Sequence, residues 1–449
     1  MKKRLAYMAW AFATALLLTG CTTDDDATLM AGQSDYITFG AQVVEPVTRA
    51  SQQPGSIDFV KLTETSFGVY GYGPTASDYS ATLSPNMFDN QKVEYVISDN
   101  STSTVLAVPG SWSYAWDAVN HQETLANLKP WPKSTDEARN LTFFAYGPYM
   151  ADVSNTGPGI TSVSKGGTGD PTIGYKVATT PPQSVDLLWG VQSETGLPWK
   201  NVTRANKSVS AVLFTMRHAL CAVGFHAQVI VNQNNELTDL YDNSAFGTKI
   251  GTTCRVTIKS ITLKPKTKSF YESGTLNLNN TVKNTPLWTV SEGDRTITQL
   301  ELRGDEIDAK LRDPAPDNAT YYTHMTTDAV PGITESANSQ IVIAKDGSSH
   351  EQFYMLIPDD SQDYEATVEY YVTYKTGEDT YKRTLYTGKA AINNLELKAG
   401  TLYYLNLVFG LTTFKLVVTA EDWTDKAINS TILVEDGTSA NSSLSRKQR

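Results

Sequence analysis

Residues 402–407, Leu-Tyr-Tyr-Leu-Asn-Leu, are followed by Gly410 and then by residues 413–420, Thr-Phe-Lys-Leu-Val-Val-Thr-Ala. From Phe414 to Val418 every second side chain is apolar and can face one side, which is the period of a β-strand with one buried face. A glycine between two such runs is a turn signal. The stretch predicts two neighbouring strands, and it is the strongest secondary-structure pattern in the chain.

Similar patterns recur along most of the sequence, and helical signals are sparse. Further strands are expected at residues 36–44, 66–72, 92–97, 112–116, 141–146, 185–191, 209–229, 253–263, 352–357, 366–374 and 382–387. Residues 134–137 have the spacing of a capping box with room for one helical turn, and residues 305–311 are the best helix candidate. Residues 151–171, rich in Gly, Ser, Thr and Asn, predict an exposed loop. The fold class is all-β, as two antiparallel β-sandwich domains in tandem.

A chain of 449 residues is too long for one hydrophobic core, and a change of composition at residues 195–208 marks a domain boundary. The expected order is a signal peptide (1–20), an acidic spacer (21–35), an N-terminal sandwich domain (36–200), a C-terminal sandwich domain (208–436) and a flexible tail (437–449). Cys221 and Cys254 lie on predicted strands, where either a disulfide or two buried free thiols is compatible with the sequence.

The first residues have the layout of a secretory signal. Lys2, Lys3 and Arg4 precede an apolar run that ends at Leu18 and is too short to cross a bilayer comfortably. Leu18-Thr19-Gly20-Cys21 resembles the lipobox of bacterial lipoproteins. The resemblance implies cleavage between Gly20 and Cys21 and acylation of Cys21, which makes this cysteine a lipid anchor. The acidic residues 24–26 resemble the tract that directs lipoproteins to the outer face in Bacteroidota.

Charge disfavours one class of partner. Without the signal peptide the chain keeps 34 basic and 48 acidic residues, a net charge of −14. Nucleic acid is therefore not expected as a partner, because phosphate binding needs a basic surface.

No pair of histidines has zinc spacing and no calcium loop is present, so we predict no metal and no cofactor. His218 and His226 lie in an apolar run and are expected to be core histidines. Arg303-Gly304-Asp305 is the integrin tripeptide, but a tripeptide occurs easily by chance.

Several segments together resemble one family. They are Ile37-Thr38-Phe39, Val47-Thr48-Arg49-Ala50, Trp131-Pro132, residues 141–146, Phe214, His218-Ala219-Leu220 and residues 397–403. Their order and spacing resemble the fimbrillin-like lipoproteins of Bacteroidales over nearly the whole mature chain. The resemblance implies a type V pilus subunit with two transthyretin-like β-sandwich domains. It also implies that an arginine-specific protease removes the first strand and that a strand from a neighbouring subunit fills the groove.

Arg49 is the expected processing site, with cleavage before Ala50. It follows a proline-containing segment at the end of the first predicted strand, and proteases favour such extended, weakly structured segments. Removal of the strand would take away about four inward apolar side chains. The burial free energy lost with them is about ten kcal/mol. Two C-terminal segments, residues 414–418 and 431–434, are candidate donor strands. The expected partners are thus other pilus subunits, the outer membrane and ligands on host or bacterial surfaces.

Two alternative functions are compatible with the sequence. The first is a surface glycan-binding lipoprotein, in which several tryptophans form a sugar platform: Trp112, Trp116, Trp131 and Trp199. The second is a surface hydrolase with a pair of catalytic carboxylates, although no motif singles out any two of them. We expect a structural and adhesive protein rather than an enzyme.

Overall fold

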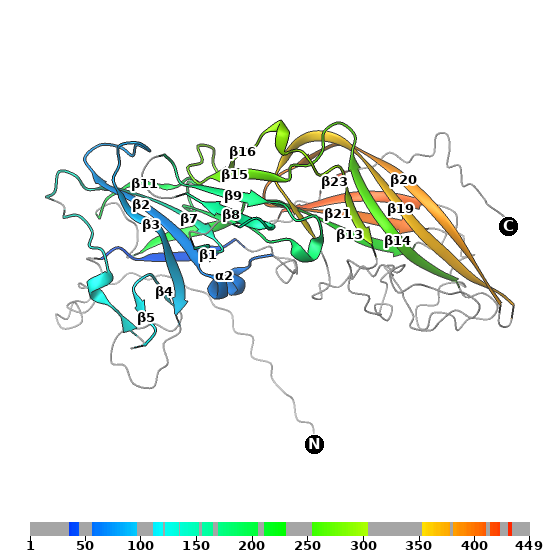
Figure 1. Ribbon diagram of the computed structural model, residues 1–449, viewed down its shortest axis with the longest axis horizontal. Helices are drawn as coiled ribbons and strands as arrows, with labels where there is room; N and C mark the ends of the chain where they lie inside the picture. The colour runs from blue at the N-terminus through cyan, green and yellow to red at the C-terminus, as the bar shows by residue number, and fades with distance from the viewer. Residues whose placement is uncertain are drawn as a thin grey trace, which may run out of the picture.

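The structure is a computed structural model that describes residues 36–44, 56–96, 111–119, 122–133, 135–151, 155–164, 169–204, 211–229, 254–303, 353–377, 380–409, 414–422 and 430–432. The regular secondary structure of its described part is predominantly β-strands in several sheets (Figure 1), which confirms the all-β class. No described helix is both long and apolar enough to cross a membrane.

The N-terminal sheet has eight strands in the order β1-β12-β10-β7-β2-β3-β4, with β11 paired to β7. Every pairing is antiparallel except that of β1 with β12, which is parallel. Its strands are β1 (Phe39–Val43), β2 (Phe67–Thr75), β3 (Asn86–Val96), β4 (Ser111–Ser113), β7 (Asn140–Gly147), β10 (Leu188–Val191), β11 (Trp199–Val202) and β12 (Val212–His218).

Both faces of this sheet are buried, because successive side chains of its central strand enter different hydrophobic clusters. On β7, Leu141 and Phe143 join a cluster with the inward residues of β1, whereas Phe144 and Tyr146 face the opposite side. The opposite side packs on a four-stranded bridging sheet made of β8 (Gly159–Val163), β9 (Thr172–Lys176), β15 (Ser273–Asn277) and β16 (Leu287–Thr289).

The bridging sheet joins segments distant in the sequence, since β9 pairs with β15 over five positions. The boundary between the two expected sandwich domains, at residues 200–208, remains a prediction. The hydrophobic cluster under the bridging sheet continues into the C-terminal strands. β8 lies inside the predicted loop 151–171, so that prediction is wrong for residues 159–163. Ile160 and Val163 bury their side chains there, although the surrounding composition is typical of a loop.

Two further sheets form the C-terminal part. One has the order β18-β13-β21-β22-β23 and the other β17-β14-β19-β20, and their inward side chains share one cluster. The first contains β13 (Cys221–Val229), β18 (Tyr354–Leu356), β21 (Thr401–Phe409), β22 (Phe414–Asp422) and β23 (Ser430–Ile432). The second contains β14 (Cys254–Pro265), β17 (Leu300–Arg303), β19 (Asp359–Gly377) and β20 (Thr380–Leu397). The strong pattern at residues 402–420 is thus confirmed as the antiparallel pair β21 and β22.

Short helices and a small ribbon complete the described structure: α2 (Phe59–Thr65), η2 (Leu125–Asn127), η3 (Pro181–Gln183), η4 (Glu292–Asp294), and β5 (Trp116–Asp117) with β6 (Gln122–Glu123). Sequence reasoning missed α2, whose N-cap Asp58 accepts a hydrogen bond from the Lys61 backbone N–H at 2.7 Å. No helix forms at residues 135–139, where a turn was expected at most. The helix candidate at residues 305–311 lies outside the described residues.

Candidate functional site: the groove of the first strand

Strand β1 lies at one end of the N-terminal sheet (Figure 1). Its inward side chains lie in the core. Ile37, just before the strand, is fully buried, Phe39 is 3 % exposed and Ala41 is 9 % exposed. Val43 is half-buried against the same cluster. The alternation predicted for residues 36–44 is therefore confirmed, and burial of these side chains contributes about 5 to 8 kcal/mol to stability.

Phe39 occupies an aromatic pocket at the centre of the groove. Its ring lies 5.2 Å from that of Phe88 and 5.4 Å from that of Phe143, both in edge-to-face contact. The rings of Tyr114 and Phe214 follow at 5.6 and 6.2 Å. These neighbours belong to β3, β7, β12 and the segment after β4, so one side chain of β1 joins several separate parts of the core.

One edge of β1 pairs with β12 in parallel register, from Phe39 opposite Val212 to Val43 opposite Met216. Flanking bonds extend this ladder: the Val212 N–H donates to the Thr38 carbonyl at 2.8 Å, and the Val44 N–H donates to the Met216 carbonyl at 3.0 Å. On the outer face the Gln42 amide donates to the Thr215 hydroxyl at 3.1 Å.

The other edge of β1 is covered by a strap, which we define as residues 111–119 and 122–131. The Trp112 indole N–H donates to the Ala41 carbonyl at 3.2 Å, and the Tyr114 hydroxyl donates to the Ile37 carbonyl at 2.9 Å. The Lys129 carbonyl accepts the Ile37 N–H at 2.8 Å. Side chains thus cover backbone groups that an unprotected edge strand would expose. Sequence reasoning placed Trp112 only in a predicted strand and in a possible sugar platform, and it did not find this role.

Both ends of the segment that follows β1 are fixed at the same end of β12. Before it, Val44 bonds to Met216; after it, the Ile57 N–H donates to the buried Asp186 carboxylate at 3.1 Å. The predicted processing site, Arg49 and Ala50, lies between them but outside the described residues. The predicted signal cleavage and lipid site, Gly20 and Cys21, also lies outside them.

Asp186 is the buried anchor of the chain after this segment. Its carboxylate is 2.7 Å from His218 Nδ1, and it also accepts the Leu187 N–H at 2.8 Å. Both side chains of the pair are at most 2 % exposed. His218 is therefore a core histidine with a polar partner, as predicted. Among the described residues, no group of three or more His, Cys, Asp or Glu could hold a metal.

Cys221 is a buried free thiol, so the disulfide alternative is not realised in this structure. It donates to the Leu356 carbonyl at 3.5 Å, and burial raises the pKa of its thiol. A thiol held in the neutral form by burial is unreactive. Cys221 therefore has a packing role on β13.

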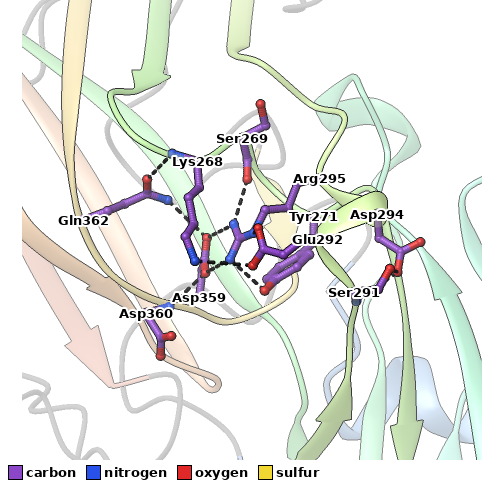
Figure 2. A network of polar contacts seen from close by, with 10 residues as sticks. All are labelled: Lys268, Ser269, Tyr271, Ser291, Glu292, Asp294, Arg295, Asp359, Asp360 and Gln362. Atoms are coloured by element: carbon purple, nitrogen blue, oxygen red, sulfur yellow. Dashed lines mark hydrogen bonds and ion pairs between the residues drawn. The ribbon is translucent and has the colours of Figure 1, made fainter.

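A second polar cluster, centred on Arg295, is closed and structural (Figure 2). Its guanidinium makes two bonds of 2.7 and 2.8 Å to Asp359, donates to the Tyr271 hydroxyl and the Ser269 carbonyl, and lies over the Tyr271 ring. Arg295 and Asp359 are 5 % and 4 % exposed. Hydrogen bonding to Asp359 raises the pKa of Arg295, which keeps it charged. The cluster fastens the η4 turn to the start of β19.

The predicted tryptophan platform is not gathered on one exposed face. Trp131 is 3 % exposed in the core, and the Trp112 indole bonds to β1. The Trp199 indole donates to the Leu213 carbonyl of β12 at 2.9 Å. The integrin tripeptide extends beyond the described residues, since only Arg303 lies within them.

The fold has solved counterparts. A fimbrial protein from Bacteroides vulgatus matches 86 % of this chain and 99 % of its own, with a TM-score of 0.51 and 16 % identity. Two proposed cell adhesion proteins, from Bacteroides uniformis and Bacteroides ovatus, are each 13 % identical and cover 80 % and 87 % of this chain and 92 % and 98 % of their own, with TM-scores of 0.34 and 0.33. No family model and no curated protein matches the chain. The chain thus shares the fold of a fimbrial protein, in agreement with the family resemblance found in its sequence.

Proposed function

We propose that this chain, which shares the fold of a Bacteroides fimbrial protein, is a structural and adhesive subunit of a cell-surface pilus and a fimbrillin-like protein. Three observations support the proposal: the order of family-like segments along the sequence, the all-β fold and a first strand seated in a groove. The proposal includes two transthyretin-like domains and no catalytic activity.

The export route follows from the N-terminal sequence. Cys21 is acylated, the signal peptide ends at Gly20, and the acidic spacer carries the protein to the outer face of the outer membrane. A Cys21→Ser chain should be neither lipidated nor cut, and it should leave the detergent phase in which the native protein partitions. Unchanged partitioning of this variant would exclude the anchor.

The observation that carries the proposal is the position of β1. It is an end strand of its sheet, its inward side chains fill a core pocket, and the segment bearing Arg49 joins it to the rest of the chain. Cleavage after Arg49 makes β1 a separate peptide held only by noncovalent contacts. Loss of β1 would remove about 5 to 8 kcal/mol of side-chain burial free energy, which is comparable to the whole stability of an ordinary domain. A strand from a second copy of the chain restores that burial and links the two subunits.

The donor strand is the C-terminal segment that begins with β23. β22 pairs with β21 over nine positions and buries Leu416 and Val418, so its departure would open the C-terminal core. β23 is an end strand that pairs with β22 over three positions, from Ser430 to Ile432. It can leave its own subunit at a smaller cost, because few backbone hydrogen bonds are lost.

The test compares Arg49→Ala with a matched control, Arg204→Ala, which removes an exposed arginine at the end of the segment after β11. Both proteins should be exported and folded. The Arg204→Ala protein should assemble filaments visible by electron microscopy, with subunits that begin at Ala50. The Arg49→Ala protein should stay monomeric and keep its first strand. Normal filaments of Arg49→Ala, or native filament subunits that begin at Cys21, would contradict the mechanism.

A further inference from the structure

The outer edge of β1 meets three strap groups in a fixed order along the strand. At Ile37 an acceptor, the Lys129 carbonyl, faces the N–H, and a donor, the Tyr114 hydroxyl, faces the carbonyl. Further along, a second donor, the Trp112 indole, faces the Ala41 carbonyl. The order of these groups, one acceptor followed by two donors, is not symmetric. It therefore matches the N–H and carbonyl groups of a strand that runs in one direction only.

Each donor is constrained in its role. The indole N–H of Trp112 can only donate. The Tyr114 hydroxyl accepts the Lys129 N–H at 2.9 Å, so its single proton is directed to the Ile37 carbonyl. Ile37, Tyr114 and Lys129 thus form a closed ring of three hydrogen bonds, of which two join Ile37 to the strap and one lies within the strap. A reversed strand would place N–H groups where the carbonyls lie, and donors would then face donors.

The strap is held in place by residues other than β1. β4 pairs with β3 from Glu94 opposite Ser113 to Val96 opposite Ser111. The Trp112 ring packs against Phe67 at 4.9 Å and Tyr95 at 5.1 Å. The Tyr114 ring lies 5.2 Å from that of Phe88 in edge-to-face contact. Trp112 and Tyr114 therefore each have a support that stays when β1 leaves.

We propose that Trp112 and Tyr114 determine the direction of the strand that occupies this groove, so that a strand from a second copy of the chain enters parallel to β12. The inference rests on the proposed strand exchange and specifies the geometry of its partner: an extended segment that presents backbone carbonyls to the strap and an apolar side chain to the Phe39 pocket.

The parallel pairing of β1 with β12 is repeated further along the chain by another pair of strands. β12 and β13 are separated only by the buried residues Ala219 and Leu220, and β13 pairs in parallel with β21. The Gly400 N–H, just before β21, donates to the Leu220 carbonyl at 2.7 Å. The strand run 212–229 thus accepts a parallel neighbour at two places.

The experiment uses the full chain with a specific protease site inserted within residues 45–55. The chain is cut at this site and is then mixed with synthetic peptides. One peptide has the sequence of residues 36–44, and the other has the same residues in reverse order, which presents the same side chains when it binds antiparallel. The forward peptide should replace the resident strand, with an occupancy at least about tenfold above that of the reverse peptide.

Direction is read by a disulfide cross-link. A Thr215→Cys chain should link to a forward peptide carrying cysteine at the Gln42 position and not to one carrying it at the Thr38 position. In the Trp112→Phe/Tyr114→Phe chain the preference for the forward peptide should fall to within about threefold. Trp199→Phe is the matched control, because it removes an indole bond to β12 rather than to β1. It should keep the full preference.

The outcomes separate the two proposals. If the reverse peptide binds as well as the forward one, or if the double variant keeps the full preference, the role of Trp112 and Tyr114 is overturned and strand exchange survives. If neither peptide enters the cut chain, strand exchange itself is overturned, and the inference about direction falls with it.

Discussion

β1 and β21 are both parallel neighbours of the strand run 212–229, but their other edges differ. β21 pairs with β13 over eight positions and with β22 over nine, so both of its edges belong to a sheet. β1 pairs with β12 over five positions, and its other edge meets side chains and one carbonyl of the strap. We therefore expect β21 to be a permanent strand and propose β1 as the exchangeable one, because fewer backbone pairs hold β1 in its sheet.

The difference also concerns covalent connection. β21 follows β20 through the short, well-defined turn at residues 398–400, in which the Tyr403 hydroxyl accepts the Lys398 N–H. β1 is joined to α2 through residues 45–55, which include Arg49. A single cut there would separate the five-residue strand from the rest of the fold while β12 and the strap stay in place. The comparison therefore predicts different responses of the two strands to mutation and to added peptide.

The largest effect is expected from Phe39→Ala. The variant leaves a cavity among four aromatic rings, and its free energy of unfolding should fall by about 3 to 5 kcal/mol in chemical denaturation. Gln42→Ala, on the outer face of the same strand, loses one hydrogen bond and should cost about 1 kcal/mol. Equal costs for the two variants would mean that β1 does not depend on its central pocket.

Leu405→Ala tests the permanent strand. Leu405 is fully buried on β21, so the variant should lose about 2 to 5 kcal/mol of stability. A peptide of residues 36–44 should restore the stability of a cut Phe39→Ala chain, because the peptide replaces the defective strand. A peptide of residues 401–409 should not restore the Leu405→Ala chain. Rescue of both variants, measured by thermal unfolding, would remove the distinction between the strands.

A smaller loss is expected from Asp186→Asn. The amide keeps the shape of the side chain but weakens its bonds to His218 and the Ile57 N–H, so stability should fall by about 1 to 3 kcal/mol. Since this anchor lies after the predicted cut, the rate at which β1 leaves the cut chain should be unchanged. A faster release of β1, followed by fluorescence of a labelled strand, would show that the anchor also holds the first strand.

Local patterns predicted much of this fold. Alternation at residues 36–44 and 413–420 identified the strands and their buried faces, because side-chain direction in a strand depends only on a two-residue period. His218 was predicted as a core histidine from its apolar surroundings. These inferences need no knowledge of which strands are neighbours.

The remaining features depend on contacts between distant segments. The parallel pairing of β1 with β12 joins residues 39–43 to residues 212–216, and no local signal specifies that register. The same holds for β8, whose pairing with β9 overrides a loop-like composition, and for α2, a helix of two turns held by one cap. The roles of Trp112 and Tyr114 were not found, because they require the position of the β1 carbonyls in space.

Native mass spectrometry of the cut chain can show directly whether β1 is an exchangeable strand. The subunit is incubated with an isotopically heavy peptide of residues 36–44, and the mass of the bound strand is followed with time. We expect the heavy peptide to replace the resident strand one for one while the subunit stays folded. If filaments form in the same preparation while the resident strand stays bound, β1 is not the strand that is exchanged.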